Sequence, residues 1–461
     1  MALFRSVLGR SGKAVMSYGM PKVVVIGAGS SSFGPAMLFD LMSNAYPSGG
    51  TLSLADIDPS ALSLMEAVAH KMRATLNVDI RIEAAVDRTE VLSGADAVLI
   101  AAEQDRLGRW RLDWEIPLRF GIKHTLGENR GPAGLSHTLR TAPLVLDVCR
   151  DVERISPGAT VIILTNPEDR LAYAASKFTG LDVIGYCDGL WDFKQNHVGK
   201  LLGLPGDRVY VEGAGINHAV WVTTLRDRKT GQDLYPALVE AARKTGWQPL
   251  GLHLYETYGL WPHENDEHYG EYIHYAHEYV GCQGYNFERR IAYVEKWRQR
   301  LKGLVDGSYE EERFIADVRE LAQGVFGDNP PSNIIAGVFL GRPTFLPNAN
   351  IRNGGRIPGL PDEMIVEVPA VATPSGVHGI RTQRLPRGIM SFLYREGTIQ
   401  MLAAEAAVEG SRAKALEALD LDPQVPSPAV AEELLDAFLD AHRDLIPVPL
   451  WHGLKGLPSP A

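Results

Sequence analysis

The sequence predicts an α/β protein in which a doubly wound parallel sheet is followed by a mixed α+β part. Three observations predict this fold: an apolar run that stops at a glycine-rich turn, an acidic residue that closes the next apolar run, and strands that alternate with helices through the first two hundred residues. We expect a poorly ordered extension over residues 1–19, the parallel sheet over 20–200, and a substrate-binding and metal-binding part over 201–461.

Composition and charge limit the classes of partner. The chain has 461 residues, enough for two domains, and its 46 Lys and Arg against 56 Asp and Glu give a net charge of -10. This balance predicts no general affinity for nucleic acid or for an anionic membrane. No long uninterrupted apolar run occurs, so no membrane span is expected. Three widely spaced cysteines favour a reducing, cytoplasmic compartment over a disulfide framework.

The first predicted strand, at 23–26, stops at a turn of small residues. Such a turn lets the backbone approach a pyrophosphate, and a helix beginning near Ser30 would point its free N–H groups at that anion. Asp56 closes the next strand, where its carboxylate could accept both hydroxyls of an adenosine ribose. Ser32 replaces the third glycine of the fingerprint, and the alternative is a glycine turn in another doubly wound sheet. We expect a Rossmann-type dinucleotide site made by Gly27, Gly29, Ser30, Ser31, Ser32, Phe33 and Asp56.

Two further buried strands are predicted at 98–102 and 160–164. After the first of them, Arg109 lies in an arginine-rich segment at the sheet edge where open α/β sheets bind ligands. Together, Arg106, Arg109 and Arg111 could clamp an anion, and a solvated charged helix face is an equal alternative. Asn166 follows the second strand, where its carboxamide could contact a sugar diol, although Asn before Pro is also a common turn.

A cysteine and a histidine end the next two predicted strands. Cys187 follows a strand at 182–186, whereas Asn217 and His218 interrupt an apolar run at 213–222. Either residue alone is more often structural. Together, a thiolate and an imidazole could converge on one divalent metal and leave coordination positions open for substrate oxygens.

The alternating pattern fades beyond about residue 225. The segment 255–279 is dense in aromatic, acidic and histidine side chains. Candidates for acid–base work there are Asp266, Glu267, His268 and Glu271, and a polar interdomain helix is the alternative. We expect strands at 333–338 and 364–368, the second preceded by a turn that contains two adjacent glycines.

These motifs in combination resemble glycoside hydrolase family 4, the NAD-dependent glycosidases that are related in fold to lactate and malate dehydrogenases. The motifs that carry the resemblance are GAGS, RLGRWRLDWEIP, GENRGPAGLSHTLRTAP, TNP, GYCDG, GINHAVW and NANIRNGGRIPGLPDEMIVEVP. Within the family, NDEHYGEYI looks most like the α-galacturonidase and α-glucuronidase branch. One position departs from the pattern, because Asp188 follows the cysteine where the family usually has His.

The resemblance implies hydrolysis of an α-glycoside, with a galacturonide or glucuronide as the expected substrate and with NAD and a divalent metal, usually Mn²⁺, as cofactors. It also implies a redox route instead of the usual carboxylate pair. Hydride leaves C3 of the sugar, a base takes the acidified C2 proton, the aglycone leaves C1, water adds, and the hydride returns.

The same resemblance implies roles for individual residues. Cys187 and His218 would hold the metal. Asp266 would be the C2 base, with Tyr258 in reserve. Glu128 would be the general acid, or equally a group that orients Arg130. Substrate contacts are expected from Arg109, Asn166, Asp188, Asn217 and His268.

Two other functions are weighed against this one. A simple NAD-dependent sugar or hydroxy-acid dehydrogenase would have the same parallel sheet, but it would need a catalytic His–Asp pair, and Cys187 with His218 favours the metal site. A catalytically silent sensor is disfavoured by the presence of Cys187, His218 and Asp266 together. The expected partner is a small-molecule glycoside, and the resemblance implies a homodimer or homotetramer.

Overall fold

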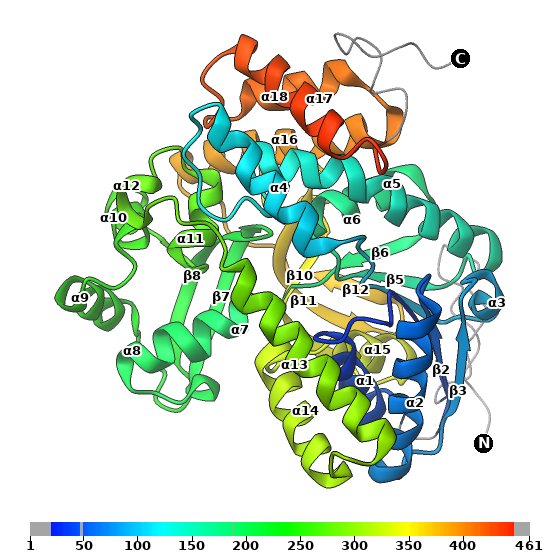
Figure 1. The fold of residues 1–461 in the computed structure, drawn as a ribbon. Coiled ribbons are helices and arrows are strands. Elements are labelled where there is room, and N and C mark those ends of the chain that lie inside the picture. The colour runs from blue at the N-terminus through cyan, green and yellow to red at the C-terminus, as the bar shows by residue number, and fades with distance from the viewer. Residues whose placement is uncertain (1–19, 47–48, 188, 447–461) are drawn as a thin grey trace, which may run out of the picture.

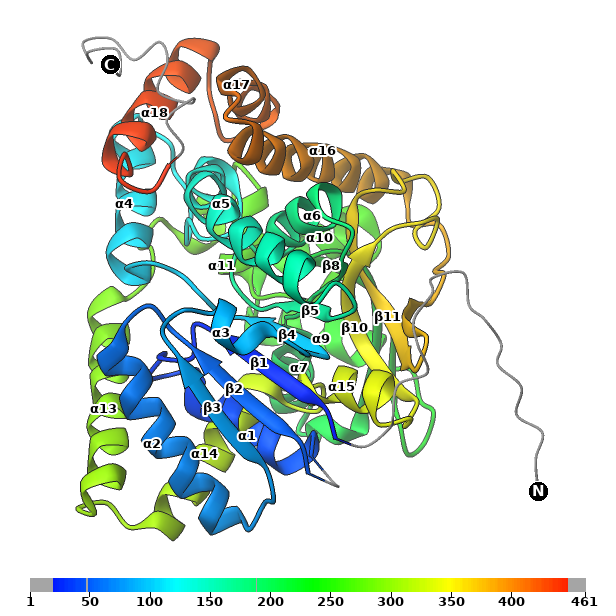
Figure 2. The same cartoon turned by 90° about the vertical axis from the view of Figure 1, so that its right-hand side faces the viewer.

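The structure is a computed structural model that describes residues 20–46, 49–187 and 189–446. The predicted extension over 1–19 and Asp188 lie outside the described residues. The described chain folds around one twelve-stranded sheet, with helices on both of its faces (Figures 1 and 2).

The N-terminal half of the sheet is parallel and has the order β3-β2-β1-β4-β5-β6. This is the doubly wound dinucleotide-binding order, so the predicted Rossmann-like fold is confirmed. Every residue of β4 and β5 is buried, as expected for apolar strands covered on both faces. The strand bounds are β1 (Lys22–Ile26), β2 (Thr51–Ala55), β3 (Arg81–Ala85), β4 (Ala97–Ile100), β5 (Thr160–Ile163) and β6 (Asp182–Gly185).

The first helix begins later than the sequence suggests. Residues 27–33 form the turn, and α1 (Gly34–Asn44) starts four residues after Ser30, with a proline in its first turn where the missing N–H costs nothing. The arginine-rich segment lies on α4 (Arg106–Arg119). The other helices of this half are α2 (Pro59–Leu76), α3 (Thr89–Leu92), α5 (Gly131–Ile155) and α6 (Glu168–Phe178).

The C-terminal strands continue the same sheet in antiparallel fashion. Asn350 on β10 pairs with Gly185 on β6, and β10 pairs with β11 across the predicted glycine-containing turn. The sheet therefore crosses the boundary predicted near residue 200, and that boundary stays a prediction. The strands are β7 (Val209–Ile216), β8 (Ala219–Asp227), β9 (Trp261–Pro262), β10 (Thr344–Arg352), β11 (Ile365–Thr373) and β12 (Gly376–Gly379).

One prediction for this half is wrong, and one alternative does not match the structure. The run 333–338 is not a strand but part of α15 (Ser332–Phe339), because a short apolar run fits a buried helix as well as a strand. Its Gly337 lies so close to β11 that a Cβ there would be 2.4 Å from that of Ala372. The segment 255–279 is not one polar helix either. Gly259, with φ +84°, ends α10, and short elements follow it.

C-terminal helices cover both faces of the N-terminal sheet. The helices α13 and α14 pack against α2 and α1, while α16 packs against α5 and α6 (Figure 2). Within the described residues, no helix is long and apolar enough to cross a membrane. The remaining helices are α7 (Gly189–Asp192), η1 (Phe193–Gly199), α8 (Lys200–Leu202), η2 (Gly206–Arg208), α9 (Tyr235–Thr245), α10 (Pro249–Tyr258), α11 (Asp266–Tyr269), η3 (Gly270–Tyr272), α12 (His277–Val280), α13 (Phe287–Asp306), α14 (Glu311–Phe326), α16 (Arg387–Glu409), α17 (Arg412–Leu421) and α18 (Pro428–Ala441).

Candidate active site

The glycine turn after β1 begins at a position, Gly27, where a side chain would be strained and would collide with its neighbours. Gly27 has φ +83°, and a Cβ there would lie 2.5 Å from the carbonyl oxygen of Ala101. The N–H groups of Gly27 and Ala28 both donate to the carbonyl of Ala55 at the end of β2. The turn is thus held against the carboxyl ends of its two neighbouring strands.

Asp56 is fixed by the same turn. Its Oδ2 accepts the N–H of Gly29 at 2.8 Å, and its Oδ1 accepts the N–H of Asp58 at 2.9 Å. A Cβ on Gly29 would lie 2.8 Å from Oδ2, so the approach depends on glycine. Ser32, which replaces the third glycine, is buried, and Phe33 packs edge to face on Phe326 of α14. The structure therefore brings the predicted nucleotide residues of the turn next to Asp56, which follows β2.

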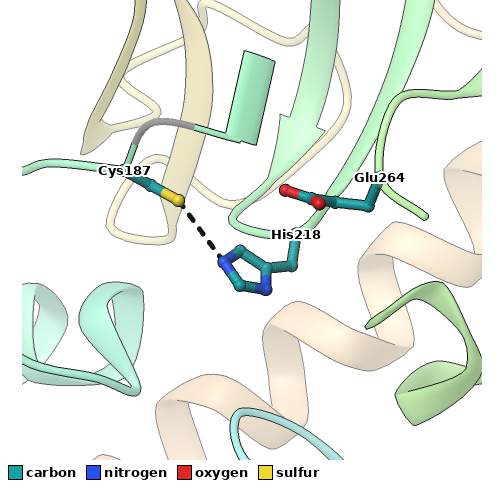
Figure 3. Close-up of side chains that lie close together, drawn as sticks. All are labelled: Cys187, His218 and Glu264. Atoms are coloured by element: carbon teal, nitrogen blue, oxygen red, sulfur yellow. Dashed lines mark hydrogen bonds between the residues drawn. The ribbon is translucent and has the colours of Figure 1, made fainter. Parts of the chain in front are cut away.

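Cys187 and His218 meet beside the carboxyl end of β6. Cys187 lies two residues beyond that strand, and His218 is in the two-residue turn between β7 and β8, with φ +62°. The Sγ of Cys187 lies 3.3 Å from the Nε2 of His218 (Figure 3). The convergence that the sequence predicts is present in the structure.

A carboxylate that the sequence analysis missed joins this pair. Glu264 follows β9 and is 5 % exposed. One ligand atom each from Cys187, His218 and Glu264 lies within 4.8 Å of the other two. Figure 3 shows the three side chains converging from separate segments of the chain. The only signal in the sequence was its place in the acid-rich and histidine-rich segment, which did not distinguish it from its neighbours.

His218 is suited to bind a metal through a neutral ring. Burial lowers its pKa well below the usual value, and nearby His268, His263 and Arg130 lower it further. The amide of Asn129 lies 3.2 Å from Nδ1, and within the described residues its Oδ1 has no hydrogen-bond partner. With the carboxamide turned by 180°, Oδ1 would accept an Nδ1–H, which is the usual second contact of a metal-binding histidine.

His268 lies directly against His218. The two rings are nearly perpendicular, with centroids 4.7 Å apart. Burial lowers the pKa of His268, but the carboxylate of Glu271, whose Oε2 lies 3.8 Å from Nδ1, and the charges of Glu264 and Glu128 outweigh it and raise this pKa to about 9. A protonated His268 therefore stands next to the Cys187–His218 pair, where it could contact substrate as predicted.

Glu128 is held by Asn166 and Arg106. It accepts from the amide of Asn166 at 3.1 Å and pairs with the Arg106 guanidinium. Burial raises its pKa, yet Arg106, His268 and Asn166 lower it overall, so an ionised Glu128 is poorly suited to donate a proton. The alternative in which Glu128 orients Arg130 does not match the structure, because Arg130 pairs with Asp169.

The two candidates for the C2 base lie at opposite ends of α10. Asp266 accepts the N–H groups of Leu250 and Gly251 at 2.8 and 2.7 Å and thereby caps the start of that helix. Burial raises its pKa to about 6 despite these two amides. Tyr258 ends the helix and packs edge to face on Trp221. In the sequence, Asp266 lies closer to His268 than Tyr258 does.

The predicted arginine clamp does not form. Arg109 donates to Asp444 at 2.5 Å and to the carbonyl of Ala441. Arg106 and Arg111 pair with two other acids, Glu128 and Glu288. Each arginine thus has its own carboxylate partner on a different segment, which is the charged helix face that the sequence left as an alternative.

A buried polar network behind the site was not predicted. The amide of Asn348 donates to the carbonyl of Cys187 at 3.1 Å and to Glu367 at 2.7 Å. Asn217, which was expected to contact substrate, donates to the other oxygen of Glu367 at 3.4 Å. The network ties the segments that carry Cys187 and His218 to β10 and β11.

Two family models match this chain along its length. The model described as "Family 4 glycosyl hydrolase" matches residues 22–203, and the model described as "Family 4 glycosyl hydrolase C-terminal domain" matches residues 213–425. The chain belongs to glycosyl hydrolase family 4. The resemblance inferred from the motifs is confirmed, and the protein is a glycoside hydrolase of this family.

Similar family 4 proteins span almost the whole chain. An α-glucosidase of Erwinia rhapontici is 29 % identical over 92 % of this chain and 98 % of its own length. An α-galacturonidase of Bacillus subtilis is 27 % identical over 91 % and 96 %. A solved 6-phospho-α-glucosidase from gut microorganisms, in complex with NAD and Mn²⁺, has a TM-score of 0.75 at 20 % identity and covers 93 % and 99 %. The last likeness shows the shared fold.

Proposed function

We propose that this family 4 enzyme hydrolyses an α-linked glycoside with the help of NAD⁺ and a divalent metal such as Mn²⁺. The observation that carries the proposal is the approach of Cys187 Sγ to His218 Nε2, 3.3 Å apart, beside the sheet edge that also holds the glycine turn. A nucleotide site and a metal site at one edge are what a redox-assisted cleavage requires.

The residues of the turn fit a dinucleotide. Gly27 and Gly29 present only backbone where a Cβ would collide, so a pyrophosphate can approach closely. Asp56 is held in place by two backbone amides and keeps lone pairs for ribose hydroxyls. When bound, NAD⁺ would accept a hydride from the sugar and later return it. The relative solved with NAD supports the assignment.

The donors at the second site fit a divalent cation. Cys187 offers a sulfur, and His218 offers a ring nitrogen that burial keeps neutral. A cation there would act as a Lewis acid toward the negative charge that develops on the sugar oxygens. The relative solved with Mn²⁺ supports this metal.

We assign the remaining steps to groups of the chain itself. Asp266 is the proposed C2 base, because its pKa of about 6 lies near working pH. Tyr258 is the reserve candidate. Glu128, ionised and bonded to Asn166, would position Asn166 toward the substrate instead of donating a proton.

A uronide is the proposed substrate. The α-galacturonidase relative, the NDEHYGEYI motif and the protonated His268 support it, because a cation can pair with a uronate. A neutral α-hexoside is the second candidate. Glu128, Glu264 and Glu271 all act on His268, which leaves an excess of negative charge around that ring, and the α-glucosidase relative agrees with a neutral sugar.

The test is a panel of nitrophenyl glycosides that includes α- and β-linked hexosides and uronides, assayed with NAD⁺ and Mn²⁺ added or withheld. We expect release of nitrophenol from an α-glycoside only when both are present, with no net accumulation of NADH. Accumulation of NADH with free sugars would instead establish a dehydrogenase. A cytoplasmic homodimer or homotetramer is the accompanying proposal, and light scattering measures the assembly.

A further inference from the structure

We propose that Glu264 is a third protein ligand of the metal, beside Cys187 and His218. The inference rests on the proposed metal site and adds to it a ligand that the sequence did not suggest. A sulfur, an imidazole nitrogen and a carboxylate oxygen lie within 4.8 Å of one another, a spacing that one ion can bridge (Figure 3).

Strand pairing fixes Glu264 relative to His218. Pro262 on β9 pairs with Trp221 on β8, and the next residue, His263, donates its N–H to the carbonyl of Val220 at 3.0 Å. His218 immediately precedes β8. The metal-binding turn and the segment that carries Glu264 are therefore neighbouring parts of one antiparallel ladder.

Gly189 provides the space that Glu264 occupies. A Cβ at this position would lie 1.9 Å from Glu264 Oε1 and 3.1 Å from His263 Nε2. Gly189 begins the short helix α7, where the backbone accommodates other residues at least as well as glycine. The absence of a side chain at Gly189 leaves room for the carboxylate of Glu264. This is a second observation that supports Glu264 as a ligand at this site.

The third donor changes what the site can hold. A thiolate and a carboxylate together balance the charge of a divalent ion, and a carboxylate oxygen is a donor that suits Mn²⁺ better than sulfur does. Three protein ligands would keep the ion bound without sugar and still leave positions for substrate oxygens. The structure thus assigns this chain a metal site that does not depend on substrate.

Titration of the full chain with Mn²⁺ alone, followed by the electron paramagnetic resonance signal of free Mn²⁺, tests the proposal without any activity assay. We expect Glu264→Gln to weaken Mn²⁺ binding at least about tenfold. Glu267→Gln is the matched control, because Glu267 is exposed and lies three residues further along the chain. Thermal unfolding in the absence of metal shows whether each variant is folded.

Gly189→Ala provides a second variant that keeps the carboxylate but removes its space. Gly189→Ala should therefore also weaken Mn²⁺ binding. In a separate titration with Co²⁺, the absorption band of thiolate-bound cobalt should persist in Glu264→Gln and disappear in Cys187→Ser. Equal Mn²⁺ affinity of the unmodified chain and Glu264→Gln would overturn the proposal and leave the Cys187–His218 site intact. Absence of Mn²⁺ binding by the unmodified chain would overturn the metal site itself.

Discussion

The glycine turn and the Cys187–His218–Glu264 cluster are made in different ways. The turn joins β1 to α1 and is hydrogen-bonded to the end of β2, and its geometry comes from glycine dihedrals and backbone amides. The cluster collects side chains from the ends of β6, β7 and β9, which are distant along the chain and are brought together by the sheet. A site made of local backbone can be read from a short motif, whereas a site made of side chains depends on how distant strands pair.

The largest effect is expected when the cluster loses its sulfur. Cys187→Ala should lower kcat/KM for the glycoside by roughly 1000-fold, because stabilisation of developing charge is lost. The dissociation constant for NAD⁺, measured by quenching of protein fluorescence, should stay within about twofold, since the turn is separate from the cluster. Cys149→Ala is the control, because Cys149 is a buried core residue on α5. A parallel loss of NAD⁺ affinity in Cys187→Ala would show that the two regions are not independent.

A substitution in the glycine turn should weaken NAD⁺ binding and leave Mn²⁺ binding unchanged. Gly27→Ala combines a positive φ with a collision against Ala101, and we expect NAD⁺ affinity to fall by roughly 100-fold while Mn²⁺ affinity is retained. Gly94→Ala separates the two causes, because Gly94 also has a positive φ, +74°, but no atom lies within 4 Å of its added Cβ. It should cost about 1 to 2 kcal/mol of stability and leave NAD⁺ binding unchanged. Equal NAD⁺ affinities of the two variants would contradict this reading of the turn.

A buried acid connects α1, which follows the turn, to the C-terminal half. Asp40 accepts hydrogen bonds from the backbone and hydroxyl of Ser332 on α15, and burial raises its pKa from 3.8 to about 6. Because the folded-state pKa is the higher one, its contribution to stability is complete below about pH 3.8 and is lost as the pH rises through 6.

Asp40→Asn should therefore gain stability relative to the unmodified chain, by roughly 2 to 3 kcal/mol between pH 4 and pH 7. Denaturant unfolding of both proteins across this range measures the difference. Parallel stability curves for the two proteins would show that Asp40 does not titrate in this way.

The smallest effect is expected at Arg109. Its partner Asp444 is about half exposed, and such an ion pair contributes less than about 1 kcal/mol. Arg109→Ala should leave KM within about twofold, as measured by steady-state kinetics. A large rise in KM would contradict this expectation and support the anion clamp predicted from the sequence.

Site residues could be predicted from the sequence where they lie at the ends of predicted strands. Gly27 and Asp56 close consecutive parallel strands, and Cys187 comes just after another, so their common edge could be predicted before any coordinates. His218 could be predicted because it interrupts an apolar run, which the structure shows to be a hairpin.

Features that depend on the pairing of distant strands or on the packing of helices could not be predicted from the sequence. Glu264 is positioned by a two-residue strand, β9, that has no recognisable pattern. The run 333–338 became helix α15 because short apolar runs do not distinguish the two structures. The arginines of α4 found separate partners, because which carboxylates face a helix is decided by the elements that pack on it.

Hydrolysis in D₂O tests the central claim most directly. The enzyme is supplied with NAD⁺ and Mn²⁺ and with the cleavable α-glycoside, and the released sugar is examined by NMR. The account predicts deuterium at C2 of the product, because a base of the protein removes that proton and solvent returns another. Product without deuterium at C2 would show that the glycosidic bond is broken by ordinary hydrolysis and would contradict the redox route.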